Sequence, residues 1–485
     1  MKNPAPAGNT AAGASGNADC AETKSAAVSA APSAQEADAQ AALRHAIALY
    51  RRGQLAEADA ILVRLAKTAA GDANVWNARG VNLRAMKRLR EAVWCYREAL
   101  ARDADKPGVW SNLGNALKDL KQVETAVACH RRAIALKPDD AGSHHNLGLA
   151  LTAAGRHTDA LAALDRALAL TPDDARLRWD RARTRLYLGE LARGWSDYEA
   201  RLATGQLPER AAPGRRWHGE RYDGKRLLII SEQGFGDAIW IARYLERVKA
   251  LGGELVMECR PELIPLVAAM GVADRLVPKS DPLPDADLHL YQCSLPGFYT
   301  PDLASVSGEP YLKAEPKRAE KFADAIARGA GKLRVGVVWC GSMTFGANHE
   351  RAVSLRLFLQ SFAMPGVQLY SLQKGPPRAE LEAMAASAPI LDLAPLLGDF
   401  GDTAAAVAAL DLVIMTDSAV AHLGGAMGKP VWVLLSLVPH WLWLADRDDS
   451  PWYRSVRLFR QRAWGDWTGV FDRAAAALMA YGCRR

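Results

Sequence analysis

The first third of the chain repeats itself at a 34-residue period, which constrains the fold more than any other feature. Gly80, Gly114 and Gly148 fall in register. Alanines recur at two further repeat positions, namely Ala92, Ala126 and Ala160 and then Ala99, Ala133 and Ala167. This period is typical of helix–turn–helix units that stack into a solenoid, with the small residues where two helices approach closely. We therefore predict about five helix pairs over residues 39–203.

The first helix of each pair is expected to line one surface of the solenoid. Asn77, Asn112, Asn115 and Asn146 fall on that surface or near its edge. Because an asparagine side chain can pair with both the N–H and the C=O of an extended backbone, these four are candidate partner-binding residues. The alternative for each is an ordinary solvated helix position.

An arginine run, Arg176 to Arg185, lies in the fifth helix pair. The favoured interpretation is a solvated face whose arginines pair with nearby aspartates. The alternative is a docking surface for the next domain or for an acidic partner.

Composition marks the remaining boundaries. Residues 1–38 are rich in Ala, Gly, Ser and Pro without an apolar run, which predicts a disordered tail. Residues 204–225 are rich in Gly, Pro and charge, which predicts a linker. Short apolar runs then alternate with helical segments, as in parallel sheets covered by helices. Because residues 308–332 contain no such run, we predict two lobes, 226–312 and 333–485.

Leu412–Leu435 is the most informative stretch of the second lobe, since it reads as strand, loop, helix and strand. The loop at the carboxyl end of such a strand presents free N–H groups at a helix N-terminus, where a phosphate can bind. Asp417, Ser418 and His422 are therefore candidate donor-binding residues. The alternatives are a plain helix cap for the first two and a buried core histidine for the third.

Two other strand ends carry candidate residues. Gly234–Asp237 follows the first strand of the first lobe, where Gly236 permits close approach of a ligand and Asp237 could act as a general base. The alternative for Asp237 is a helix N-cap. Lys374 follows a strand of the second lobe and could neutralise a departing diphosphate, unless it is an ordinary loop lysine.

Charge and cysteine usage narrow the class of protein. The 61 basic and 54 acidic residues give a net charge of +7, which suits anionic substrates without requiring nucleic acid. The seven cysteines form no C-x-x-C pair, which argues against a zinc site and suits a reducing compartment. Without an apolar run of about 18 residues, the expected location is the cytoplasm. We expect no metal and no bound cofactor.

Six of the 14 tryptophans lie in the last part of the chain, after residue 431. Most are expected to anchor loops to the second lobe. Trp441 and Trp443 are the exceptions that could stack on a sugar or a base, because they follow a strand end.

These motifs carry a resemblance. With GFGD at 234–237, SLQKG at 371–375 and TDSAVAHLGGAMGKPVW at 416–432, the α/β region resembles glycosyltransferase family 9, the ADP-heptose:lipopolysaccharide heptosyltransferase-like proteins of GT-B fold. The repeats resemble the tetratricopeptide family, and the combination resembles bacterial tetratricopeptide-repeat glycosyltransferases. The fold class implied is multidomain, an all-α tetratricopeptide solenoid followed by a GT-B-like pair of Rossmann-type α/β lobes.

The resemblance implies a metal-independent, inverting sugar transfer from a nucleotide sugar to a protein or glycan acceptor recruited by the repeats. Asp237 would be the catalytic base, while Asp417, Ser418 and His422 would hold the donor and Lys374 would lie near the leaving group. The alternative is a non-catalytic repeat scaffold with a degenerate nucleotide-sugar-binding domain. The short first lobe and Ala352, where the subgroup tends to have serine, favour that alternative.

Overall fold

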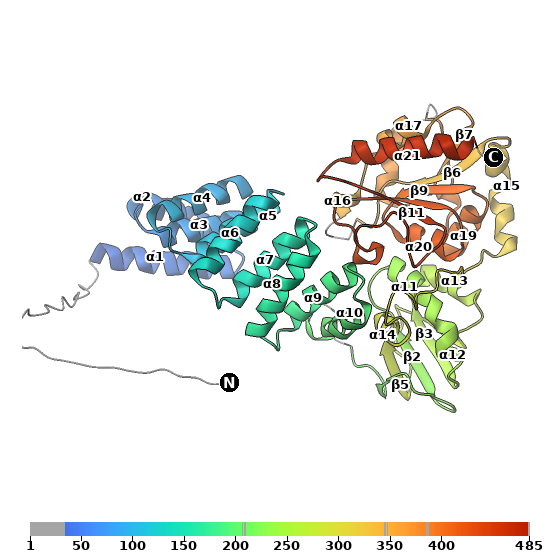
Figure 1. Ribbon diagram of the computed structural model, residues 1–485, viewed down its shortest axis with the longest axis horizontal. Coiled ribbons are helices and arrows are strands. Elements are labelled where there is room, and N and C mark those ends of the chain that lie inside the picture. Colours follow the sequence, from blue (N-terminus) through green and yellow to red (C-terminus); the bar gives the residue numbers. More distant parts are fainter. Residues whose placement is uncertain are drawn as a thin grey trace, which may run out of the picture.

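The chain forms an all-helical array followed by two parallel β-sheets (Figure 1). The computed structural model describes residues 34–205, 207, 210–343, 346, 348–384 and 388–483. Figure 1 shows the array reaching out from one side of the two sheet-containing lobes, with α9 and α10 nearest to them. This arrangement confirms the predicted change from a helical solenoid to parallel α/β layers.

Successive helices of the array pair into five hairpins within the described residues. Their bounds are α1 Ala34–Arg51, α2 Leu55–Thr68, α3 Ala73–Ala85, α4 Leu89–Arg102, α5 Pro107–Asp119, α6 Val123–Leu136, α7 Ala141–Ala153, α8 His157–Leu170, α9 Ala175–Tyr187 and α10 Leu191–Tyr198. A 3₁₀ turn, η1 (Glu199–Ala203), ends the array. The predicted start at residue 39 is wrong, because α1 already begins at Ala34. Residues 1–33, most of the predicted tail, lie outside the described part of the chain.

The local sequence explains where the first helix of each hairpin begins. Asp72, Asp140 and Asp174 cap α3, α7 and α9, since each carboxylate accepts a hydrogen bond from a backbone N–H of the first turn. Pro107 opens α5, where its missing N–H costs nothing. These starts recur at the repeat period, so the helix boundaries repeat along with the sequence.

The glycines that define the period lie where two helices touch. A Cβ built on Gly80 would lie 2.5 Å from the Tyr96 ring, one on Gly114 would lie 2.7 Å from the His130 ring, and one on Gly148 would lie 2.8 Å from Leu164. In each hairpin the first helix therefore packs its backbone directly against a large side chain of the second helix. The expected close approach of the helices is confirmed.

The first lobe is a five-stranded parallel sheet with the order β1-β5-β2-β3-β4. Its strands are β1 Arg215–Arg216, β2 Arg226–Ile230, β3 Glu254–Cys259, β4 Arg275–Pro278 and β5 Leu288–Tyr291. Its helices are α11 Phe235–Ile241, α12 Leu245–Lys249, α13 Ile264–Ala268 and α14 Leu295–Tyr299. The central strand β2 is buried along Leu227–Ile230, as expected for a strand covered on both faces.

The predicted linker, 204–225, is partly wrong. Its second half belongs to the first lobe, because β1 pairs with β5 and the Trp217 side chain is fully buried. Two residues of strand are too short to leave an apolar pattern, so composition alone could not distinguish this segment from a linker.

The second lobe is a six-stranded parallel sheet with the order β11-β10-β9-β6-β7-β8. Its strands are β6 Leu333–Val338, β7 Val367–Ser371, β8 Ile390–Asp392, β9 Leu412–Thr416, β10 Val431–Leu435 and β11 Val456–Arg460. Its helices are α16 Asn348–Arg351, α17 Leu355–Phe362, α18 Ala379–Met384, α19 Phe400–Ala408, α20 Ala419–Ala426 and α21 Trp467–Gly482, with α15 (Ala323–Ala327) before it. The strand–helix–strand predicted over 412–435 is present as β9, α20 and β10.

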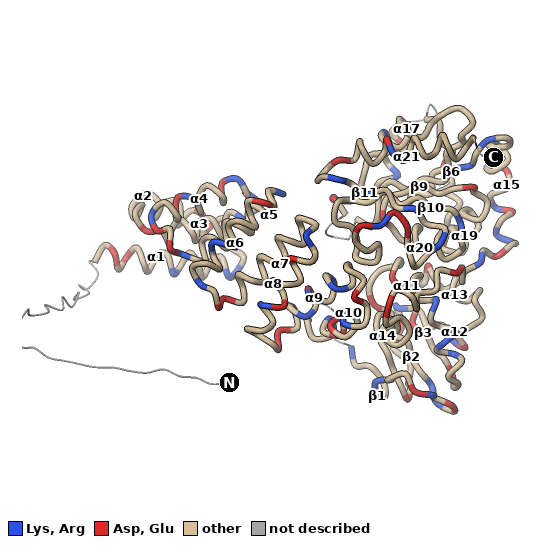
Figure 2. The backbone as a smooth tube through the Cα atoms, in the orientation of Figure 1, with Lys and Arg blue, Asp and Glu red and all other residues tan. Residues whose placement is uncertain are grey.

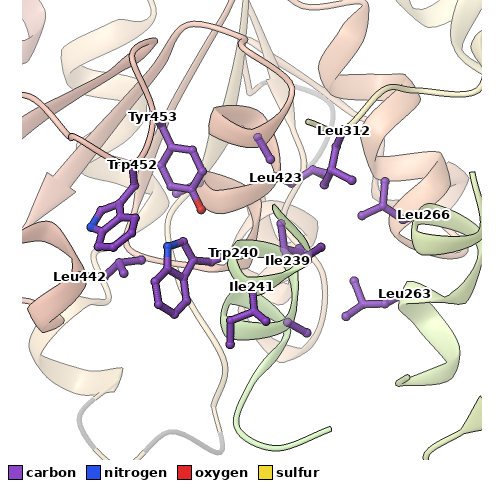
Figure 3. Close-up of a cluster of buried hydrophobic side chains, with 14 of the residues drawn as sticks. Ile239, Trp240, Ile241, Leu263, Leu266, Leu312, Leu423, Leu442, Trp452 and Tyr453 are labelled. Atoms are coloured by element: carbon purple, nitrogen blue, oxygen red, sulfur yellow. The ribbon is translucent and has the colours of Figure 1, made fainter. Parts of the chain in front are cut away.

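One hydrophobic core joins the end of the array to both lobes. Trp195 of α10 lies 6.1 Å from Trp240 of α11 and 5.5 Å from Trp441 of the second lobe, measured between ring centroids. Figure 3 shows Trp240 pointing toward Trp452 and Tyr453 of the second lobe. The repeats are therefore packed against the lobes and not merely tethered to them.

The glycine register predicts a difference between two substitutions in α5. Gly114→Ala would force a Cβ against the fully buried His130 ring, so we expect the free energy of unfolding to fall by about 1–2 kcal/mol. Gly108 has open space around it, so Gly108→Ala should leave stability unchanged or raise it by up to ~1 kcal/mol. Urea unfolding of both variants measures this, and equal effects would contradict the packing argument.

His130 predicts a pH dependence of stability. Burial lowers the pKa of His130 to about 4, and both of its ring nitrogens are buried without a hydrogen-bond partner. Since the unfolded chain binds this proton from about pH 6.5 downward, the free energy of unfolding should fall between pH 6.5 and 4, by on the order of 3 kcal/mol. Tyr96 and Leu164 occupy the same repeat position, so Leu is a compatible replacement.

His130→Leu should therefore flatten the slope of stability against pH in that window. His45→Leu, at an exposed position of α1, is the matched control and should leave the slope in place. Unfolding midpoints at pH 4.5, 5.5 and 7 measure the effect. A slope that is the same in wild type and His130→Leu would show that this histidine does not titrate as described.

Candidate functional site

Asp237 lies in the first turn of α11, at the carboxyl edge of the first sheet. Its carboxylate accepts a hydrogen bond from the Gly234 N–H at 3.0 Å, so it does cap its own helix. The side chain is only partly buried, and one carboxylate oxygen carries this bond. Burial raises the pKa of Asp237 above its usual range, opposed by nearby His440 and by the Gly234 N–H. Capping and a role as proton acceptor are therefore compatible here.

Gly236 and His422 meet where the two lobes touch. A Cβ on Gly236 would lie 2.7 Å from the His422 ring, so glycine is required for α11 to pack on α20. The helices that follow β2 and β9 thus pack against each other at the interface between the two lobes.

His422 is nonetheless a buried, packed side chain. Its ring stacks on Trp443 at 5.1 Å, and its Nδ1 lies 3.1 Å from the Tyr453 hydroxyl. Burial lowers the pKa of His422 to about 4, so the ring is neutral at pH 7. These contacts match the core-histidine alternative more closely than the donor-binding prediction.

Asp417 and Ser418 occupy the loop between β9 and α20. Asp417 is buried and lies 3.7 Å from Arg351, whose guanidinium also packs on Gly341 at the end of β6. Ser418 is the N-cap residue of α20, although its side chain makes no capping hydrogen bond. The carboxyl ends of β6 and β9 are therefore linked by an arginine.

Lys374 follows β7 and is exposed. Its ammonium donates a hydrogen bond to the backbone carbonyl of Leu397. The lysine is thereby held at the carboxyl edge of the second sheet, on the side of β7 and β8.

A cavity beside this edge has a volume of about 640 Å³ and lies between the array and the second lobe. The lobe contributes Arg351, Asp417, Ser436 and His440, together with Trp441 and Trp464. The array contributes residues from α3, α5, α7 and α9 and from the turns after α3 and α5, including Arg84, Lys87, Lys118, Lys121, Asp180, Arg183 and Tyr187. Among the described residues that line it, Asp417 is the one candidate donor-binding residue.

His440 is a residue of this cavity that sequence reasoning missed. Its Nδ1 accepts the Leu442 N–H at 3.3 Å, so the neutral ring carries its proton on Nε2. Burial lowers the pKa of His440, whereas Asp237 and Asp417 raise it. His440 therefore interacts with one carboxylate from each lobe. A histidine in an apolar loop gave no motif by which to find it.

A second cavity, of about 560 Å³, opens at the carboxyl ends of β6 and β7. Cys340, Met343 and Asn348 line one side, and Pro376, Pro377 and Ala379 line the other. A mostly apolar pocket beside the first, charged cavity suits a flat aromatic ring better than a phosphate.

The asparagines of the array bridge neighbouring repeats. Asn112 donates to the Asn77 side chain, and Asn146 donates to the Ser111 hydroxyl, both at 3.0 Å. Asn115 is half-buried on the same helix as Asn112. Within the described residues none of these four lines the 640 Å³ cavity, so their predicted contact with a partner stays a prediction.

Trp441 and Trp443, the two tryptophans predicted as candidates for stacking on a ligand, differ in their surroundings. Trp443 is fully buried and stacked on His422, so the prediction that it could stack on a ligand is wrong. Trp441 packs against Trp195, Tyr198 and Trp240, but it also lines the cavity.

Charge does not mark a binding face on its own, since basic and acidic residues alternate along the array and both lobes (Figure 2).

In the described ranges, no group of three or more His, Cys, Asp or Glu side chains could hold a metal ion. Across the same residues, no helix combines the length and apolarity needed to cross a membrane.

Comparison with known proteins identifies the array. A family model described as TPR repeat matches residues 114–155, and one described as Tetratricopeptide repeat matches residues 141–174. Among solved structures, one of PilF from Pseudomonas aeruginosa is 20% identical and covers 36% of this chain and 80% of its own, with a TM-score of 0.34. A thermophilic TPR protein of Thermus thermophilus is 23% identical and covers 35% of this chain and 93% of its own, with a TM-score of 0.32.

A relative extends beyond the repeats. Protein FlbA of Caulobacter vibrioides is 30% identical over 334 residues, an alignment that covers 63% of this chain and 55% of FlbA. The chain thus spans about half the length of the curated relative that it matches. Together with the family models, the geometry shows that the helical hairpins are tetratricopeptide repeats, a scaffold for protein–protein interaction.

Proposed function

We propose that this chain is a glycosyltransferase that moves a sugar from a nucleotide-sugar donor to a protein or glycan acceptor recruited by the repeats. The observation that carries the proposal is the meeting of α11 and α20. The helices that follow a central strand of each parallel sheet meet there, at the carboxyl ends of β2 and β9, and this is the edge of a sheet at which α/β proteins bind nucleotides. The family 9 motifs and a GT-B-like pair of lobes agree with it.

The proposed chemistry is a single displacement with inversion. The acceptor hydroxyl oxygen forms a bond to the anomeric carbon while the bond from that carbon to the diphosphate oxygen breaks. Asp237 takes the hydroxyl proton, and its raised pKa makes it a stronger base than an exposed aspartate. The bonding electrons leave with the nucleoside diphosphate, so no metal is needed to balance the step.

Charge on the leaving diphosphate requires a cation, and two are available. Arg351 lies at the junction of β6 and β9 beside the cavity, and the N-terminus of α20 adds free backbone N–H groups. Lys374 is the further candidate, provided that it leaves the Leu397 carbonyl. The second, apolar cavity would take the base of the nucleotide.

The walls of the large cavity support an acceptor brought by the repeats. Four inner helices of the array face Asp417 and His440 across it, so a chain bound along the array could enter the cavity directly. A cytoplasmic location, where nucleotide sugars are made, fits this proposal.

The second candidate is a non-catalytic scaffold that binds a nucleotide sugar. It is favoured by the lining of the 640 Å³ cavity, which in the described residues includes Asp417 but not Asp237, so the proposed base does not face that space. Binding without turnover distinguishes this candidate from the first.

Asp237→Asn should abolish transfer while leaving binding intact. It keeps an oxygen for the Gly234 N–H but removes the base, so we expect kcat to fall by about 10²–10⁴-fold. Nucleotide release from a panel of UDP-, GDP- and ADP-sugars measures turnover, and a thermal shift with the same panel measures binding. In wild type, kcat/KM should fall on the acid side as Asp237 becomes protonated, at a pH above the usual aspartate range.

Asp140→Asn is the matched control, because Asp140 also caps a helix but lies in the array, outside the cavity lining. It should leave release unchanged. Release that persists in Asp237→Asn would remove the base assignment. A thermal shift without release in wild type would favour the scaffold.

A further inference from the structure

A buried ion pair connects the last turn of the repeat array to the loop that carries Asp237. Arg201, in η1, donates to both carboxylate oxygens of Glu232, from Nε at 3.0 Å and from Nη2 at 2.7 Å. Each side chain is 2% exposed. Glu232 lies one residue beyond β2, after Ser231 and five positions before Asp237 in the sequence.

Both partners of this pair are fully bonded. The remaining Arg201 donors reach the Tyr198 carbonyl, the Glu199 carboxylate and the Ser294 hydroxyl. Glu232 also accepts the Cys293 N–H at 2.8 Å, and its carbonyl accepts from Gln292. Such a pair gains little stability over a packed apolar pair, but losing one partner leaves a buried charge without a counterion. Its effect is therefore to fix geometry.

The backbone conformation of the residue after Glu232 is the geometry that these contacts fix. Gln233 has φ of 60°, a left-handed conformation that is unfavourable for a residue with a side chain. Its carbonyl is held by Arg260 at 3.0 Å, and the Gly234 N–H is held by Asp237. On the other side, the Ser231 N–H donates to Glu258 and the Ser231 carbonyl accepts from Lys279, both at 3.0 Å.

Every residue from Ser231 to Gly234 is thus held by a neighbour, and only Glu232 is held by the repeat array. A strained backbone persists when its surroundings prevent relaxation. If Glu232 lost Arg201, one of the restraints that keep Gln233 in its left-handed conformation would be gone, while the bonds from Arg260 and Gln292 would remain. The first turn of α11 follows directly, so a shift of this backbone would move Asp237.

We propose that Arg201 is a positioning residue for Asp237, through which the repeat array sets the geometry of the catalytic loop. The array would then be a structural part of the site as well as a surface for partners. This inference rests on the proposed function for the role of Asp237, although the mechanical link from Arg201 to the loop can be tested without it.

The test compares Arg201→Met with Arg181→Met in the full-length chain. Arg181 also makes a two-bond pair, with Asp197 at 2.7 and 2.9 Å and entirely within the array, although this pair is less buried and Arg185 shares Asp197. Both variants are expected to lower the thermal midpoint. Hydrogen exchange of the amides at 232–237, measured without substrate, should accelerate about tenfold or more in Arg201→Met and remain at the wild-type rate in Arg181→Met.

Kinetics supply the second readout, with nucleotide sugar as the probe. Arg201→Met should lower kcat at least about tenfold with the KM for the nucleotide sugar changed less than about threefold, because the donor lies against the other lobe. Arg201→Lys, which keeps the charge but loses the two-bond geometry, should fall between wild type and Arg201→Met. Arg181→Met should retain the wild-type kcat.

A double variant separates an effect on stability from an effect on the position of Asp237. Arg201→Met with Glu232→Gln removes the uncompensated charge, so the thermal midpoint should return toward wild type while kcat stays low. Equal loop exchange in Arg201→Met and Arg181→Met, or a kcat that recovers together with stability, would overturn the positioning role. If wild type releases no nucleotide, the proposed function fails, and the exchange comparison alone decides whether Arg201 holds the loop.

Discussion

The packing of Trp195 against Trp240 and Trp441 is the contact on which the rest of the structure depends. One indole from the last repeat touches both lobes, and its Nε1 donates to the Thr300 carbonyl at 2.8 Å. Large aromatic rings bury more area than other side chains, so this cluster is a strong joint. Because three parts of the chain share this joint, it fixes the position of the two lobes relative to each other and relative to the array.

The candidate site residues consequently come from all three parts of the chain. Burial influences the charge states of two of them, Asp237 and His440. Asp237 comes from the first lobe, while Asp417, Arg351 and His440 come from the second and Arg183 from the array. Burial favours the neutral forms of Asp237 and His440, whereas their mutual attraction favours the charged forms. The charge states of Asp237 and His440 therefore depend on each other.

The elements that were predicted correctly are those whose cause lies in a short stretch of sequence. The glycine register gave the hairpins because each glycine meets a side chain a fixed distance along the sequence, and apolar runs gave β2, β6 and β9. The failures involve distant partners: β1 exists only by pairing with β5, and Trp443 is buried by His422. Asp237 and His422 were predicted near the starts of two helices, and these helices, α11 and α20, do pack together, whereas a site shared by the two residues stays a prediction. The sequence could not reveal that His440 lies with Asp417 in the cavity, or that Arg201 pairs with Glu232, because no short motif encodes those contacts.

The contacts between the lobes also determine where open space remains beside the second lobe. Arg243 of the first lobe donates to the carbonyls of Ser307 and Trp452, and its guanidinium lies over the Tyr453 ring at 4.9 Å. Tyr453 in turn contacts His422, which packs on Gly236. This chain of buried contacts packs α11 against α20. In the described residues the 640 Å³ cavity beside Asp417 lies between the second lobe and the array, so anything that enters it also touches the array. Under the proposed function, an acceptor held by the repeats would therefore share this cavity with the donor side of the second lobe.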